Sequence, residues 1–126
     1  MIAIPVVIVI GVLLFVKDNP AEHTVREAEG REFAKTTDQE GCMREGLSRA
    51  RHINLLSIEQ LGYNHDFVQE CLKSSRPTSG FCEGIPTSFV ADAINWQEKQ
   101  CKKSGMDEVL TGCKAVFEDK VQFCNE

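Results

Sequence analysis

The chain has 126 residues, in which 19 aspartates and glutamates outnumber 14 lysines and arginines, for a formal net charge of −5. This acidic balance argues against a nucleic-acid partner, because proteins that bind phosphate backbones concentrate cations on one face. After residue 16, β-branched residues are sparse and helix formers such as Glu, Lys, Gln, Ala and Leu dominate. We therefore expect an all-α protein.

Residues 1–16 form an apolar run without a charged side chain, which ends at Lys17. At about 1.5 Å per residue, a helix of this length is shorter than a hydrocarbon core of about 30 Å, but snorkelling of Lys17 would extend its reach. The alternative is a cleaved signal segment, although no basic residue precedes the run and no small-x-small cleavage site follows it. We expect residues 1–16 to be a membrane-anchor helix.

Residues 17–37 are charged and mostly polar. Asn19 and Pro20 suit the N-cap and the first position of a helix. The apolar stripe of this helix is thin, and Gly30 interrupts it. We expect a stalk helix or a loosely ordered linker here, between the membrane and a six-cysteine helical domain over residues 38–126.

Apolar residues recur at three- and four-residue spacing within the domain, which predicts a bundle of about four helices. The third helix is expected to turn Phe89, Val90, Ala93, Ile94 and Cys101 inwards. A short helical turn closed by Gly62 is expected to precede the second helix. The expected bounds are Thr37 or Asp38 to about Asn54, Asn64 to the loop at Ser74, Thr87 or Ser88 to a stop at Gly105, and Met106 to about Cys124.

Six cysteines lie in the domain: Cys42, Cys71, Cys82, Cys101, Cys113 and Cys124. A lone buried cysteine is an ordinary small hydrophobe, but an even set of this density is typical of a disulfide framework. Disulfides persist in oxidising compartments. We therefore expect the domain to lie in an extracytoplasmic space, namely a periplasm, a cell surface or a secretory lumen.

Helix register narrows the pairing. Cys113 and Cys124 share one helix and lie about 16 Å apart along it, so they cannot bond to each other. A turn between the first two helices brings Cys42 towards Cys71. A hairpin at Gly105 brings Cys124 towards Cys82. Cys101 and Cys113 then remain as the third pair, and a bond between them requires the two helices to cross at a tilt. The expected pairs are Cys42–Cys71, Cys82–Cys124 and Cys101–Cys113.

The sequence contains no Cys-x-x-Cys pair, no Gly-rich phosphate loop and no Gly-x-Ser-x-Gly nucleophile elbow. His23, His52 and His65 are widely separated, and we expect each to be a surface side chain. We therefore expect no catalysis, no cofactor and no metal site.

Two functions remain. The first is a membrane-tethered structural or interaction module that binds another protein in the extracytoplasmic space. The second is a carrier of a small apolar ligand, whose cavity would be lined by Phe67, Phe89, Trp96 and Phe117. A solid core with an exposed apolar patch favours the module, whereas a cavity of about 300 Å³ or more favours the carrier. A redox factor would need an exposed free cysteine.

Overall fold

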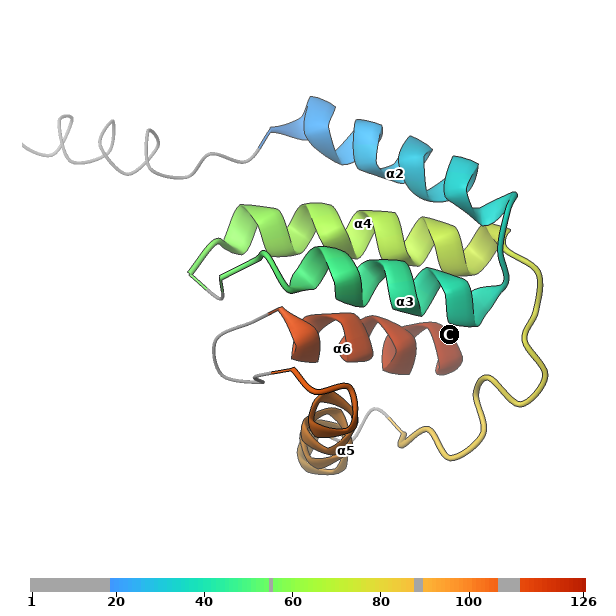
Figure 1. Ribbon diagram of the computed structural model, residues 1–126, viewed down its shortest axis with the longest axis vertical. Helices are drawn as coiled ribbons and strands as arrows, with labels where there is room; N and C mark the ends of the chain where they lie inside the picture. The colour runs from blue at the N-terminus through green and yellow to red at the C-terminus, as the bar shows by residue number, and fades with distance from the viewer. Residues whose placement is uncertain (1–18, 55, 88–89, 107–111) are drawn as a thin grey trace, which may run out of the picture.

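The computed structural model describes residues 19–54, 56–87, 90–106 and 112–126, and these ranges form a helical bundle without a β-strand (Figure 1). The all-α class is therefore confirmed. The anchor expected over residues 1–16 lies outside the described residues, and none of the helices within them is long and apolar enough to cross a membrane. The helices are α2 (Pro20–Ala34), α3 (Gln39–Ala50), α4 (Ile58–Ser74), α5 (Val90–Lys103) and α6 (Cys113–Cys124).

The first described helix, α2, begins where its sequence predicts. The side-chain oxygen of Asn19 accepts a hydrogen bond from the backbone N–H of Ala21 at 3.1 Å, and Pro20 occupies the first turn. Both residues suit the place where helical N–H groups lack intrahelical partners. The helix then continues through Gly30 without a break.

The expected stalk is instead a member of the bundle, because α2 lies along α4 (Figure 1). A Cβ atom at Gly30 would lie 2.4 Å from the backbone oxygen of Phe67, so the two helix backbones approach each other closely. Ala34, one turn later, is buried in the core. Small residues make this contact, so the sequence of α2 lacks the stripe of large apolar side chains that usually marks a packed helix.

Helix α3 begins after Asp38, whose carboxylate accepts from the N–H of Gly41 at 2.9 Å, as expected of an N-cap. Helix α4 differs from the prediction, since one continuous helix replaces the turn at Gly62 and the cap at Asn64. Asn64 is buried, and its side-chain amide donates to the carbonyl oxygen of Gly46 at 3.2 Å. A tertiary hydrogen bond thus uses a side chain that could equally have capped a helix.

The core surrounds α4, which packs against α2, α3 and α6 (Figure 1). Its apolar side chains interdigitate with those of α3 and α6, and Phe33 of α2 approaches Phe67 with ring centroids 5.8 Å apart. The core residues that are at most 1% exposed are Cys42, Ala50, Phe67, Val68, Cys71, Leu72, Cys101, Cys113 and Val116.

Three disulfides join these elements. Cys42–Cys71 links α3 to α4, Cys101–Cys113 links the end of α5 to the start of α6, and Cys82–Cys124 links the loop before α5 to the end of α6. These are the pairs expected from the helix registers. Helix α5 is seen nearly end-on in Figure 1, so it crosses α6 steeply, as the Cys101–Cys113 bond requires.

The end of α5 follows the sequence closely. Gly105 has a φ of 69°, a left-handed conformation that glycine adopts without strain, and the N–H of Met106 donates to the carbonyl oxygen of Cys101 at 3.1 Å. The expected cap at Ser88 and the first residues of the last predicted helix, over 107–111, lie outside the described residues.

The close contact of α2 with α4 makes a testable prediction. Gly30→Ala should lower the free energy of unfolding by about 1–3 kcal/mol, because its methyl group would push the two backbones apart. Gly62→Ala is the matched control: its methyl group would lie 3.6 Å from the nearest atom of His23, so it should raise stability by about 0.5–1 kcal/mol through helix propensity. Urea unfolding of the oxidised protein measures both, and equal effects would contradict the packing described.

Candidate functional site

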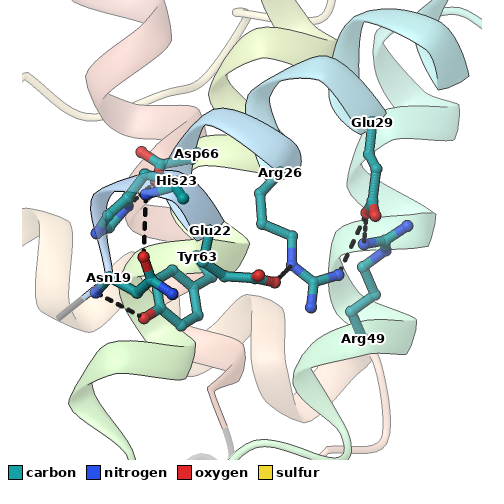
Figure 2. Close-up of polar contacts among 9 residues, drawn as sticks. Asn19, Glu22, His23, Arg26, Glu29, Arg49, Tyr63 and Asp66 are labelled. Carbon is teal, nitrogen blue, oxygen red and sulfur yellow. Dashed lines mark hydrogen bonds and ion pairs between the residues drawn. The ribbon is translucent and has the colours of Figure 1, made fainter. Parts of the chain in front are cut away.

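Polar side chains gather where α2 begins beside α4 (Figure 2). The Tyr63 hydroxyl oxygen accepts from the backbone N–H of Asn19 at 3.1 Å, and the imidazole of His23 bonds to the carboxylate of Asp66. The His23 and Tyr63 rings also meet edge to face, with centroids 4.8 Å apart. These contacts hold the first turns of α2 against α4.

A cavity of about 350 Å³ opens beside this network, between α2, α3 and α4. Two guanidinium groups and a tyrosine line it, which is a donor-rich set suited in principle to an anion. Asn64 also contributes, and its buried Oδ1 atom has no hydrogen-bond partner among the described residues. The lining residues are Arg26, Arg49, His52, Ile53, Ser57, Gln60, Tyr63 and Asn64.

The charge of the two arginines is already neutralised by carboxylates. Glu29 lies 3.2 Å from Nη1 of Arg26 and 3.1 Å from Nη1 of Arg49, as Figure 2 shows. Glu22 pairs with Arg26 at 3.0 Å, and Glu45 pairs with Arg49 at 3.2 Å. The hydrogen bond from Arg49, more than any other contact, holds the pKa of Glu29 below its usual range. Three carboxylates thus face two guanidinium groups, and little positive potential is left for an anionic ligand.

Arg49 has a further structural contact, because its guanidinium carbon lies 3.7 Å from the centroid of the Phe67 ring. A cation placed over an aromatic face is attracted by the ring quadrupole. The same side chain therefore bonds to α2 through Glu29 and covers a core residue of α4. We assign the polar network to the docking of α2 rather than to ligand binding.

A second histidine–aspartate pair lies on another side of α4. The Nδ1 atom of His65 bonds to the carboxylate of Asp119 on α6, and Asp119 is only 4% exposed. The side-chain amide of Gln69 donates to the backbone oxygen of Asp119 at 2.9 Å. Two adjacent residues of α4 therefore bind different helices: His65 binds α6, and Asp66 binds α2. His23 and His65, expected to be plain surface side chains, are only partly exposed and cross-link helices.

Burial raises the pKa of Asp119 to about 6, against the opposing effect of its bond to His65. That bond, in turn, raises the pKa of His65, although partial burial acts in the opposite direction. Perturbed pKa values of this kind occur both at catalytic sites and in structural ion pairs. The contacts of this pair join α4 to α6, so we assign it to stability.

A groove of about 370 Å³ lies between α5 and α6. Two exposed apolar side chains border it, Val90 at 69% and Ile94 at 42%, next to the buried Ala93 and Val121. These positions correct the sequence interpretation, which placed Val90 and Ile94 in the core. The polar lining comes from α6 and the residues after it, namely Glu118, Gln122, Asn125 and Glu126.

Disulfides brace the elements on both sides of this groove. Cys101–Cys113 holds the end of α5 to the start of α6, and Cys82–Cys124 holds the loop before α5 to the end of α6. The side-chain amide of Asn125 donates to the carbonyl oxygens of Val121 at 2.8 Å and Pro86 at 3.1 Å. The groove is thus formed before any partner arrives.

The aromatic residues expected to line a ligand cavity are not brought together around one. Phe67 lies beneath Arg49, and Trp96 meets Phe117 edge to face with centroids 5.6 Å apart. None of these three lines the α2–α3–α4 cavity or the α5–α6 groove. Phe89 lies outside the described residues.

All six cysteines are paired, so no thiol is free for redox exchange. Three closed disulfides indicate an oxidising, extracytoplasmic environment for the domain. In the part of the chain that the structure describes, no group of three His, Cys, Asp or Glu side chains could hold a metal ion.

No family model, curated protein or solved structure matches the chain. The function must therefore be inferred from the geometry of this molecule alone. Of the two hollows, the groove between α5 and α6 combines unpaired apolar surface with a rigid frame, and it is the better candidate for a binding site.

The His65–Asp119 pair predicts how stability depends on pH. Both pKa values are raised in the folded protein, so the folded state holds these protons more tightly than the unfolded chain. The free energy of unfolding should therefore fall by about 1–3 kcal/mol as the pH rises from about 5 to about 7.5. Asp38 and Glu29 have lowered pKa values and act with the opposite sign, but only at lower pH.

Urea unfolding of the oxidised protein across this pH range tests the prediction, with Asp119→Asn as the control. Asparagine keeps the size of the side chain but does not titrate, so the variant should show a much smaller slope. A wild-type protein whose stability is constant or rises with pH over this interval would contradict the assignment.

Proposed function

We propose that the protein is a membrane-tethered, disulfide-braced helical module that binds another protein in an oxidising extracytoplasmic space. The observation that carries this proposal is the α5–α6 groove with its exposed Val90 and Ile94. Single exposed apolar residues are common on protein surfaces. Val90 and Ile94 lie one helical turn apart in a hollow, beside buried apolar groups. Together they form a surface that can bind apolar side chains of a partner.

The size and charge of the groove specify the kind of partner. A hollow of about 370 Å³ holds a few side chains rather than a whole domain, which favours a short segment of the partner chain. Glu118 and Glu126 lie along the groove, and the protein carries a net charge of −5. A segment in which an apolar residue is flanked by Lys or Arg complements both features.

The braced frame supports this role because it lowers the cost of binding. A loose surface must lose conformational entropy when a partner arrives, whereas a pre-formed groove has lost it during folding. The two disulfides and the Asn125 hydrogen bonds fix the elements that border the groove.

Residues 1–16 would supply the tether, since their run of apolar side chains is compatible with a membrane helix. Tethering raises the effective concentration of the module towards partners at the same membrane. A weak, short-segment interaction would then suffice.

The two hollows, of about 350 and 370 Å³, reach the volume expected of an apolar-ligand carrier. The first is lined mainly by polar side chains, and the aromatic residues proposed for a ligand cavity pack against other protein groups instead of lining either hollow. The carrier is therefore the second candidate.

Selection from a random peptide library on the full-length protein in nanodiscs tests the proposal. We expect the selected peptides to combine a large apolar residue with neighbouring Lys or Arg. Ile94→Asp should lower the affinity for the selected peptides about 10-fold or more, because a carboxylate would enter the apolar part of the groove. Val25→Asp is the matched control, since Val25 is 49% exposed on α2 and lies outside the groove.

Fluorescence anisotropy gives the affinities. Equal affinity of the selected peptides for the two variants would place the binding surface elsewhere and overturn the proposal. Selection of acidic peptides would equally contradict the partner chemistry.

The acidic side of the groove makes a separate prediction. Glu126→Gln should lower the affinity for a basic peptide by a few-fold and reduce the salt dependence of that affinity, because one exposed charge pair is lost. Titrations at low and at physiological salt measure this effect. Replacement of the flanking Lys of the peptide by Gln is the complementary control, and an unchanged salt dependence in both cases would exclude the charge contribution.

A further inference from the structure

A second exposed apolar pair lies at the turn between α3 and α4. Leu56 is 88% exposed and Ile58 is 77% exposed, the highest values among the large apolar side chains of the described residues. The backbone here is ordered by its own hydrogen bonds, since the N–H of Leu56 donates to the side-chain oxygen of Asn54 at 3.0 Å. Both side chains are thus open to solvent, whereas the large apolar side chains of the core, such as Phe67 and Leu72, are at most 1% exposed.

This turn lies at the end of the bundle where α2 begins. The start of α2 and the start of α4 lie at the same end, as Figure 1 shows, and Asn19 bonds to Tyr63. Ile58 precedes Tyr63 by five residues, so α4 extends about 7.5 Å beyond the level of that contact. We call Leu56 and Ile58 the tip pair.

The apolar run of residues 1–16 ends only three residues before Asn19. Three residues span at most about 11 Å, even when fully extended. Wherever Val16 meets the edge of the hydrocarbon core, Asn19 must therefore lie in or just outside the headgroup layer, which is about 5–8 Å thick on each side. In a protein tethered through residues 1–16, the end of the bundle that carries the tip pair would consequently be held at the membrane surface.

We propose that the tip pair is a second membrane contact, in which Leu56 and Ile58 insert into the interface of the bilayer that holds residues 1–16. This inference rests on the membrane tether of the proposed function. Exposed apolar side chains beside cations are typical of interfacial contacts. Arg51 is exposed at the turn, and Glu59 is an acidic neighbour. The Cys101–Cys113 bond holds the exposed Lys102 and Lys103 of α5 near the same end of α6.

A second contact would fix how the domain stands on the membrane. A tether alone lets a domain rotate about its attachment, whereas two contacts restrict it. The turn packs against the start of α6, because the N–H of Gly112 donates to Ala50 and a Cβ at Gly112 would meet Leu61 and Ile53. The α5–α6 groove includes Asn125 and Glu126, beyond the opposite end of α6. Insertion of the tip pair would thus turn this part of the groove away from the lipid.

Tryptophan fluorescence in brominated bilayers tests the proposal on the full-length protein. Leu56→Trp and Ile58→Trp each place a reporter in the tip pair. Val90→Trp is the matched control, because Val90 is 69% exposed but lies in the groove. In vesicles of dibromo-phosphatidylcholine, the added emission of both tip reporters should be quenched roughly twofold or more beyond that of the control, after subtraction of the wild-type signal from Trp96.

Vesicle flotation separates the two ways in which the idea can fail. If the variants float with the vesicles but the tip reporters are quenched no more than Val90→Trp, the tip contact is wrong and the tether stands. If the full-length protein does not float at all, the tether is wrong and the tip contact falls with it. Flotation together with selective quenching of both tip reporters supports the second contact.

Discussion

The rest of the structure depends on the burial of α4 from several sides. Phe67 and Val68 are adjacent in sequence and both fully buried, and Cys71 and Leu72 repeat the pattern one turn later. Adjacent residues on a helix point about 100° apart, so these pairs give α4 an apolar surface too wide for one neighbour to cover. Helices α2, α3 and α6 pack around it, and α5 is then held to α6.

Polar groups on α4 specify which helix takes which side. Asp66 binds His23 of α2, whereas the preceding residue, His65, binds the buried Asp119 of α6. A buried carboxylate without its partner would be costly, so a bundle with α2 and α6 exchanged would lose stability. The bond between Glu29 of α2 and Arg49 of α3 adds the same kind of selectivity between these two helices.

Two pairs of exposed apolar side chains on the described surface have different neighbours. The tip pair lies at the end of the bundle where α2 begins (Figure 1). Val90 and Ile94 lie between α5 and α6, beside buried apolar groups and acidic side chains. Disulfides brace the elements around the second pair, while the first lies on a short turn. This division suits a protein that meets lipid at one end and a partner chain at another.

The sequence by itself determined the helical class, the cap at Asn19, the stop at Gly105 and the helix registers that narrow the disulfide pairing. These features depend on local backbone chemistry and on helix periodicity, which neighbouring residues encode. The sequence left Thr37 and Asp38 as alternative caps of α3, and the structure places Asp38 there. Tertiary structure alone decided that α2 joins the bundle, that Asn64 bonds to Gly46 rather than capping a helix, and that Val90 and Ile94 face outwards. Each depends on which surface a distant helix covers. Gly30 shows this most clearly, because a residue that looks locally like an interruption of the helix becomes a point of close contact between α2 and α4, where the backbone of Phe67 leaves no room for a Cβ atom.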